Sequence, residues 1–281
     1  MRPFSLNIHG RLRVYTRTAV MGIINVTPDS FYASSRAVTA DEIGRRAAGM
    51  VSAGADMLDI GAYSTRPGAA VVSEEEEMER LRLGLRAVRD AVGDDMPVSV
   101  DTFRASVARM CVEELGADII NDISGGTLDK DMFVTVAGLR VPYILMHTRG
   151  TPADMQQHAV YGDVVADVIG ELSRSLWQLD ELGVSDVIVD PGFGFAKTME
   201  QNYRMLARLD AFAMLGRPVL VGVSRKSMFS RLLGIDAASA LVPTAVAGAL
   251  AVERGASILR VHDVEAARQS IAIIDQIEKM Q

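Results

Sequence analysis

The chain has 281 residues, of which 49% are hydrophobic and 23% charged, and its formal net charge is −7. This composition predicts a soluble globular protein, and the acidic balance argues against nucleic acid as a partner because phosphate binding needs a basic surface. No run reaches the roughly 18 apolar residues of a membrane span and no apolar signal-peptide region is present, so we expect a cytoplasmic protein. The length fits an α/β barrel of about 250 residues, and we predict a single domain over residues 1–281.

The first residues predict a short β-hairpin. Two β-rich segments, Leu6–Ile8 and Arg11–Tyr15, lie on either side of His9 and Gly10. We expect this hairpin to plug the floor of the domain that follows.

Eight short apolar runs come next, and they are continuously apolar rather than alternating. Such runs are typical of parallel strands in a sheet that is covered on both faces. Segments with helical periodicity separate them, and this alternation predicts a (β/α)8 TIM barrel. We place the strands at Val20–Asn25, Met57–Gly61, Val98–Asp101, Ile119–Asp122, Tyr143–His147, Val187–Asp190, Val219–Ser224 and Ser257–His262.

Helix starts are clearest at Thr39 and Ser73, each of which is followed three residues later by a Glu, as in a capping box. The acidic run Glu74–Glu77 then falls in a first helical turn, where the helix dipole favours negative charge, and we interpret it as a solvated cap. A further helix is predicted over Asp163–Leu182. Its Trp177 is interpreted as a core or subunit-interface residue.

Nearly every apolar run ends in a polar residue. Asp101 and Asp190 end two Val-rich runs, and Asn121 lies at the end of a third. A carboxylate there is costly unless it is paired or hydrogen-bonded, and any one of these residues alone could simply bond loop N–H groups. Because the carboxyl ends of barrel strands share one mouth, all three should meet. Together they indicate a pocket for a flat heterocycle that is rich in N–H donors.

Basic residues follow the last two runs. Ser224 and Lys226 lie two residues apart, as do Arg260 and His262, so in extended chain each pair points to one side. The loops after strands seven and eight are the usual phosphate site of such barrels, and Arg and Lys donate charge-assisted hydrogen bonds to phosphate oxygens. We therefore predict an anion site here, with Arg66 as a clamp from the opposite side.

These motifs together resemble the dihydropteroate synthase family, the folate-pathway enzymes among the pterin-binding barrels. The matching blocks span Met21 to Val264 in the order in which the family carries them. They read MGIINVTPDSF, DIGAYSTRPGA, SVDTFRASVA, INDISGG, LMHTRGTPADMQ, DPGFGFAKT, VGVSRKSMF and ILRVHDV.

The resemblance implies a transferase in which the amino group of 4-aminobenzoate attacks the methylene carbon of 6-hydroxymethyl-7,8-dihydropterin diphosphate. Diphosphate leaves and 7,8-dihydropteroate forms. A strongly anionic leaving group calls for charge stabilisation and positioning more than acid–base catalysis. The family pattern further implies Mg²⁺ bound by Asn25, sensitivity to sulfonamides, and a homodimer, for which apolar faces around Ala245–Val252 or Ile271–Ile277 could serve.

The family pattern also assigns residues to each part of the reaction. It places at the pterin Asp101, Asn121, Asp190, Phe195, Gly222 and Lys226. It places at the diphosphate Asn25, Thr65, Arg66, Arg260, Val261 and His262. It places at the aminobenzoate Phe31, Thr65, Pro67, Phe195 and Ser224. The residues expected to act on the reacting groups are Thr65, Arg66, Lys226 and Arg260.

The chain departs from the family pattern in two loops. Tyr32–Arg36 follow Phe31 where many members carry Ser-Asp-Gly-Gly, and Ala62–Tyr63 stand where Gly-Glu is frequent. Neither change replaces an assigned residue. We expect them to affect loop dynamics and inhibitor affinity more than the reaction.

Three alternatives stay open. A corrinoid-dependent methyltransferase acting on methyl-tetrahydrofolate would share the barrel but would not need Arg66, Lys226 and Arg260 as a diphosphate cage. An aldolase that uses a Schiff-base lysine would want that lysine inside a strand, whereas Lys226 lies just past strand seven. A non-catalytic pterin binder would be expected to lack a diphosphate ligand or to have a broken closing loop.

Overall fold

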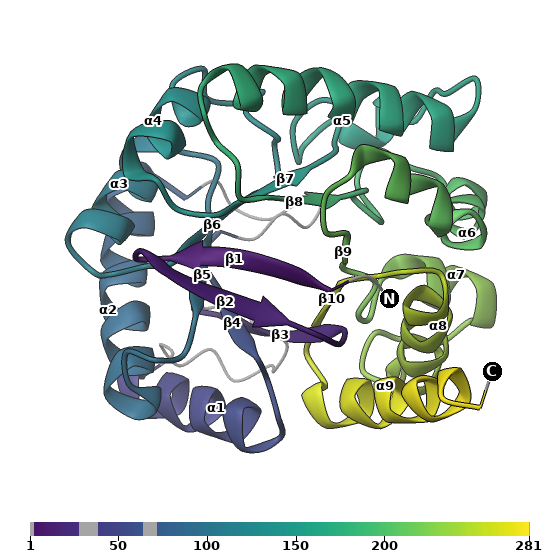
Figure 1. Cartoon of the computed structure of the whole chain (residues 1–281), viewed down its shortest axis with the longest axis horizontal. Helices are drawn as coiled ribbons and strands as arrows, with labels where there is room; N and C mark the ends of the chain where they lie inside the picture. Colours follow the sequence, from purple (N-terminus) through teal and green to yellow (C-terminus); the bar gives the residue numbers. More distant parts are fainter. Residues whose placement is uncertain (1–2, 28–38, 64–71, 281) are drawn as a thin grey trace.

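The computed structural model describes residues 3–27, 39–63 and 72–280, and its centre is one sheet of parallel strands ringed by helices (Figure 1). The strands of this sheet are β3 (Ala19–Asn25), β4 (Met57–Gly61), β5 (Val98–Asp101), β6 (Ile119–Asp122), β7 (Tyr143–Met146), β8 (Val187–Asp190), β9 (Leu220–Val221) and β10 (Ile258–Val261). They are ordered β8-β7-β6-β5-β4-β3-β10-β9. A parallel bridge between Val189 and Val219 joins the two ends. The predicted (β/α)8 TIM barrel is confirmed in nearly closed form.

Four strands differ from their predicted bounds: β3 begins one residue earlier, at Ala19, and β10 is one residue shorter at each end. The strand predicted over Val219–Ser224 is reduced to Leu220–Val221, because its register with β10 covers only these two residues. The chain then turns away, with Arg225 in the left-handed region at φ 54° and its N–H donated to Thr244 Oγ1 at 3.0 Å. Strand β7 ends at Met146, one residue before the predicted end.

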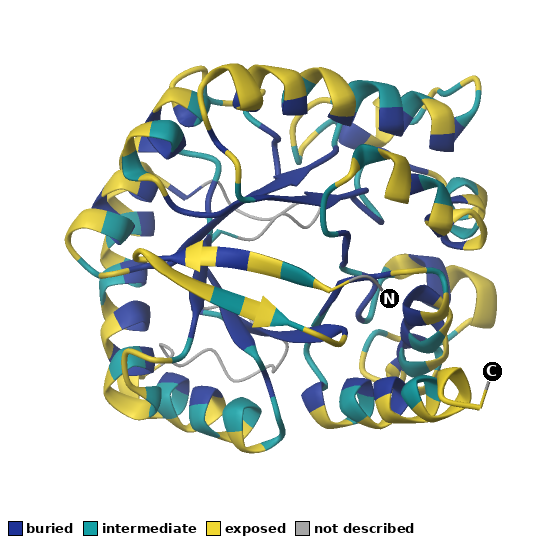
Figure 2. Ribbon diagram, in the orientation of Figure 1, coloured by how far each residue is buried: buried dark blue, intermediate teal, exposed yellow. Residues whose placement is uncertain are grey.

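The helices pack around the outside with their apolar stripes against the sheet, so in Figure 2 their inner faces are buried and their outer faces exposed. They are α1 (Ala40–Ser52), α2 (Glu74–Val92), α3 (Ala105–Glu113), α4 (Met132–Leu139), α5 (Val164–Glu181), α6 (Met199–Ala207), α7 (Ser227–Leu233), α8 (Leu241–Glu253) and α9 (Val264–Glu278). Short 3-10 helices cover Met155–His158 and Leu209–Leu215.

Helix capping follows the sequence signals in part. Thr39 and Glu42 form the complete capping box, with both reciprocal bonds to the backbone. Ser73 accepts a hydrogen bond from the N–H of Glu76 at 3.2 Å, whereas the carboxylate of Glu76 pairs with Arg80 on the next turn.

Two predictions about helix surfaces hold only in part. Glu74, Glu75 and Glu76 are exposed, as predicted for a solvated cap, but Glu77 is not. Glu77 is fully buried rather than solvated, because it lies on the inward stripe of α2 one turn before Leu81, and it pairs with Arg104 at the start of α3. Burial raises the pKa of the Glu77 carboxyl. Trp177 is 65% exposed, so it is not a core residue, and its other predicted place, at a subunit interface, stays a prediction.

The predicted N-terminal hairpin is confirmed and closes the barrel floor. Strands β1 (Phe4–Ile8) and β2 (Arg11–Tyr15) pair antiparallel and cross the foreground of Figure 1. Leu6 and Ile8 enter a closed cluster with apolar residues of the barrel strands, among them Met57, Ile119 and Ile258. In the part of the chain that the structure describes, no helix is long and apolar enough to cross a membrane.

Candidate active site at the barrel mouth

The strand register brings the predicted polar ends to one mouth of the barrel. Asn25 pairs with Gly61, Gly61 with Asp101, and Asp101 with Asn121, which sets these residues at one level on adjacent strands. Asp190 ends β8, beside Met146 of β7. The sequence predicted this convergence from the strand ends alone.

A third acidic residue, Asp59, organises the mouth and was missed by the sequence reasoning. It is fully buried in the middle of β4, and its Oδ2 accepts from Arg260 Nε at 2.6 Å and from Asn121 Nδ2 at 3.0 Å. Arg260 Nη2 also donates to Asp101 Oδ2 at 2.9 Å. Asp59 thus ties the guanidinium of β10 to the amide of β6. A single Asp inside the apolar run Met57–Gly61 was the available signal.

The carboxyl of Asp101 is poised to change its protonation near neutral pH. Burial raises its pKa to about 7, an effect that the positive charge of Arg260 opposes and the negative charge of Asp59 reinforces. A carboxyl with this pKa can accept hydrogen bonds when ionised and donate one when protonated. The charge of Asp101 therefore depends on what binds beside it.

The charges of Asp190 and Lys226 act on each other at the mouth. Burial raises the pKa of Asp190, and the N–H of Gly192 at 2.8 Å and the charge of Lys226 partly offset this rise. Burial and the charge of Arg260 lower the pKa of Lys226 to about 8. A Cβ on Gly222 would lie 3.8 Å from Asp190 Oδ2, so Gly222 lines the same space.

Phe195 lies beside this cation. The Lys226 ammonium is 4.4 Å from the centre of the Phe195 ring, a distance at which the ring face attracts a cation. Gly194, with φ +82°, allows the approach, since a Cβ there would lie 3.1 Å from Lys226 Cδ. The predicted pterin-side residues that lie within the described chain therefore surround one space.

Ser224 and His262 form a linked pair at the exit of the last strands. Ser224 Oγ lies 3.0 Å from His262 Nδ1 and accepts from the His262 backbone N–H at 3.2 Å. Burial and the charge of Arg260 lower the pKa of the imidazole to about 4, so His262 is neutral at pH 7. The side chain of Val261 packs in the core between sheet and helices, which leaves its backbone as the part available to a ligand.

Several assigned residues fall outside the described chain. They are Phe31, Thr65, Arg66 and Pro67, together with the departing residues Tyr32–Arg36. Within residues 3–27, 39–63 and 72–280, no group of three or more His, Cys, Asp or Glu is placed to hold a metal ion.

Known proteins resemble this chain over nearly its whole length. The family described as pterin binding enzyme matches residues 21–262. A dihydropteroate synthase of Synechocystis is 42% identical over 264 residues, covering 93% of this chain and 90% of that protein. The Yersinia pestis dihydropteroate synthase, solved with a sulfonamide drug, superposes with a TM-score of 0.91 at 35% identity over 98% of this chain and all of that one. The Xanthomonas albilineans enzyme in complex with 7,8-dihydropteroate gives 0.86 at 34% identity, covering 98% of each chain.

Proposed function

Because the chain belongs to the pterin binding enzyme family, and within it to the dihydropteroate synthases, we propose that it condenses 6-hydroxymethyl-7,8-dihydropterin diphosphate with 4-aminobenzoate. The products are 7,8-dihydropteroate and diphosphate, and the chain is a transferase of folate biosynthesis. The observation that carries this proposal is the cluster of Asp101, Asn121, Asp190, Lys226 and Arg260 at one barrel mouth.

The pterin is held by the acceptors of the mouth. Ionised Asp190 offers two oxygens to the N–H edge of an amino-pyrimidinone, and the amide of Asn121 adds an acceptor and a donor. Lys226 donates to the pterin carbonyl or a ring nitrogen, while Phe195 and Gly222 bound the ring. Asp101 completes the set, because N–H donors beside it favour its ionised form and lower its pKa from about 7.

The diphosphate lies toward Arg260 and the neutral His262, next to the backbone of Val261. Arg260 is already ordered by Asp59 and Asp101, so no long side chain has to be immobilised when the anion binds. The family resemblance adds Thr65 and Arg66 to this group. These positive charges and N–H donors stabilise the charge that develops on the leaving oxygen.

Mg²⁺ is the implied cofactor, and Asn25 is its candidate ligand. Mg²⁺ takes hard oxygen donors and commonly uses one or two from the protein and the rest from substrate phosphates and water. The half-buried amide of Asn25 at the end of β3 fits that donor set. When bound, Mg²⁺ would neutralise charge on the diphosphate oxygens.

The family resemblance assigns the aminobenzoate to Phe31, Thr65, Pro67, Phe195 and Ser224. Its amine nitrogen uses its lone pair to form the new C–N bond to the methylene carbon. The C–O bond breaks with its electron pair going to diphosphate, and the amine then loses a proton. The site therefore accelerates the reaction in two ways. It holds the amine and the methylene carbon in line, and it stabilises the negative charge on the leaving diphosphate.

We also propose a cytoplasmic homodimer that neither crosses a membrane nor binds nucleic acid. Helices α8 and α9 carry large apolar side chains that are exposed in the isolated chain: Leu241, Val242, Val246, Leu250, Ile273 and Ile277. Exposed large apolar side chains on two helices that pack together are typical of a subunit interface. The barrel of residues 1–281 forms the single domain of each subunit.

An assay of purified chain tests the function. Dihydropterin diphosphate and Mg²⁺ are supplied with and without 4-aminobenzoate, and the products are identified by mass. We expect diphosphate release coupled to formation of dihydropteroate. Binding of the pterin by intact protein without release of diphosphate would instead identify a non-catalytic pterin binder.

A further inference from the structure

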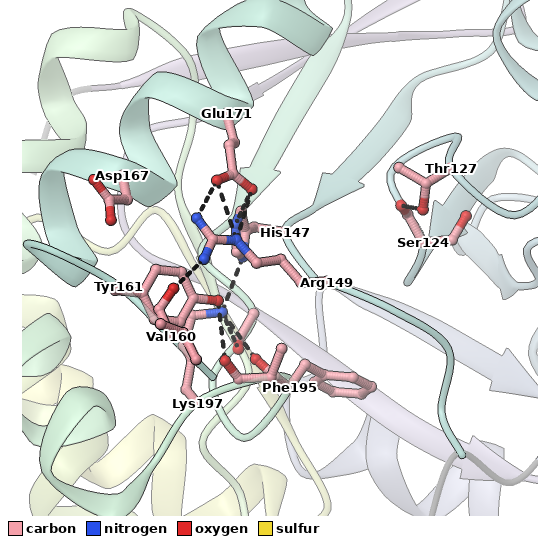
Figure 3. Close-up of polar contacts among 12 residues, drawn as sticks. Ser124, Thr127, His147, Arg149, Val160, Tyr161, Asp167, Glu171, Phe195 and Lys197 are labelled. Atoms are coloured by element: carbon pink, nitrogen blue, oxygen red, sulfur yellow. Dashed lines mark hydrogen bonds and ion pairs between the residues drawn. The ribbon is translucent and has the colours of Figure 1, made fainter. Parts of the chain in front are cut away.

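Lys197 is a buried lysine that none of the proposed steps uses. It follows the turn between β8 and α6 and is 2% exposed. Its Nζ lies 3.0 Å from each of three groups, His147 Nδ1, the Gly192 carbonyl and the Phe195 carbonyl. Figure 3 shows the ammonium between His147 and the backbone next to Phe195.

The hydrogen-bond pattern requires that either Lys197 or His147 be in its protonated, positively charged form. His147 Nε2 lies 2.9 Å from the Glu171 carboxylate, so this nitrogen carries the donated hydrogen and Nδ1 faces Lys197. An ammonium then has three N–H donors for three acceptors. A neutral amine would leave one acceptor without a donor unless His147 carried the proton instead. Burial lowers the pKa of Lys197 to about 7 and that of His147 to about 4, so the proton belongs to Lys197.

The charges around Lys197 come from every element that packs on it. Asp190 at the end of β8 and Glu171 of α5 raise its pKa, whereas Arg149 after β7 and Lys226 after β9 lower it. Arg149 itself is bonded to Glu171 and lies 4.0 Å over the ring of Tyr161. The hydrogen bonds to His147 and Arg149 lower the pKa of Glu171 to about 2, so Glu171 is a fixed anion at the far end of the network.

The turn that Lys197 holds has an unusual backbone. Gly192 has φ +73°, and a Cβ there would meet the His147 carbonyl at 1.9 Å. Ala196 has φ +48°, a conformation that costs free energy in a residue with a side chain and persists only when its surroundings fix it. The anchors are the two carbonyl bonds of Lys197 and the bond from the Tyr161 hydroxyl to the Ala196 carbonyl at 2.9 Å.

We propose that Lys197 is a positioning residue, whose buried ammonium holds the turn after β8 so that the Phe195 ring stays against Lys226 at the barrel mouth. Lys197 bonds the carbonyl of Phe195 itself, and the ring of Phe195 lies 4.4 Å from Lys226 Nζ. His147 and Glu171 supply the acceptor and the remote anion that keep Lys197 charged. The effect on the reaction rests on the proposed function, because Phe195 is assigned there to the pterin and to 4-aminobenzoate.

The composition offers a direct test. The lysines of the chain are Lys130, Lys197, Lys226 and Lys279, so protein labelled with ¹³C in the lysine side chains gives few NMR signals, each assignable by substitution. Protons above an aromatic ring face are shifted upfield, and the Lys226 side chain should show this shift. Phe195→Leu provides the reference without the ring, and Lys130→Met, at an exposed lysine, is the matched control.

We expect Lys197→Met to move the Lys226 signal most of the way to its position in Phe195→Leu, with Lys130→Met unchanged. In the same variant, KM for 4-aminobenzoate should rise about tenfold while kcat changes far less, as expected for lost binding rather than lost chemistry. A folded Lys197→Met protein with the wild-type Lys226 signal would overturn the proposal. This signal is read without turnover, so it decides the role of Lys197 even if the chain makes no dihydropteroate.

A second variant leaves the turn itself intact. The Glu171 carboxylate raises the pKa of Lys197, so Glu171→Gln should lower that pKa. In the wild type, we expect the upfield shift of the Lys226 signal to fade as pH rises through about 7, where Lys197 loses its proton. In Glu171→Gln the shift should fade at a lower pH. An upfield shift with the same pH dependence in both proteins would contradict the proposal. This variant decides the question even if Lys197→Met fails to fold.

Discussion

The floor and the mouth of this barrel differ in the kind of side chain that they bury and in what that burial does to the free energy of folding. At the floor, a hairpin closes the strands with apolar residues such as Leu6 and Ile8, which gain free energy by leaving water. At the mouth, Asp59, Asp101 and Arg260 are taken out of water, and their burial costs free energy that their mutual contacts offset only in part. We infer that the floor stabilises the fold, whereas the mouth holds charged groups in place for a ligand.

The largest effect that would test this contrast is expected at Arg260. Arg260→Ala leaves Asp59 buried without its cation, which should lower the free energy of unfolding by about 3 kcal/mol. It should also weaken binding of the pterin diphosphate about a hundredfold, the value of two charge-assisted hydrogen bonds of about 1.5 kcal/mol each. Calorimetric titration with the pterin diphosphate, and separately with the pterin alcohol that lacks the diphosphate, shows whether Arg260 binds the anion or the pterin ring. Equal losses for both ligands would remove Arg260 from the anion site.

At the floor, Leu6→Ala should lower the free energy of unfolding by about 3 kcal/mol because it opens a cavity in the closed cluster. Ligand affinity at the mouth should not change. Leu12→Ala, in the same hairpin but 68% exposed, is the matched control and should leave stability nearly unchanged. Denaturant unfolding and pterin titration of both variants check this, and an affinity that fell with Leu6 would show that the two ends are coupled.

Asp190→Asn should have the opposite profile, with pterin affinity reduced by about 2 kcal/mol and stability preserved. The amide keeps one acceptor oxygen and sets an N–H donor against the donors of the ligand. Stability is preserved because the substitution removes a carboxyl whose charged form is disfavoured by burial. Asp94→Asn, at an exposed position, controls for the loss of a charge. Wild-type affinity in Asp190→Asn would refute the pocket assignment.

A smaller effect follows from the pKa of Asp101. Since the ionised form accepts the N–H donors of the pterin, affinity should rise about eightfold between pH 6 and 7.5 as the carboxyl with a pKa of about 7 loses its proton. The free energy of unfolding should change in the opposite direction and fall as pH rises. The folded-state pKa is raised, so the contribution of Asp101 is fully present below its ordinary pKa of 3.8 and is lost as pH rises through about 7. Asp101→Asn should flatten both profiles in titration and unfolding series, and unchanged profiles would assign them to another group.

The sequence predicted those features of the molecule that depend on neighbouring residues in the chain and missed those that depend on distant ones. The strand runs and the polar residues that end them, such as Asp101 and Asp190, are local patterns, and the barrel mouth followed from them. Asp59 was missed because its partner Arg260 lies 201 residues away, and only the closed sheet brings them together. Glu77 was misread in part for the same reason, since Arg104, the cation that pairs with it on the inward face of α2, comes from the start of the next helix.

Lys197 lies within a motif that the sequence did reveal, yet its environment could not be read from that motif. Its partners come from the end of β7 and from its own turn, and the anion that supports it comes from α5. A buried lysine is visible only when these three elements have packed.

The most direct test of the active-site assignment is a crystal structure of the chain with 6-hydroxymethyl-dihydropterin diphosphate bound. We expect the pterin edge on Asp101, Asn121 and Asp190, with the diphosphate against Arg260 and His262. A ligand bound elsewhere, or one whose diphosphate points away from Arg260, would contradict the assignment of the mouth as the active site.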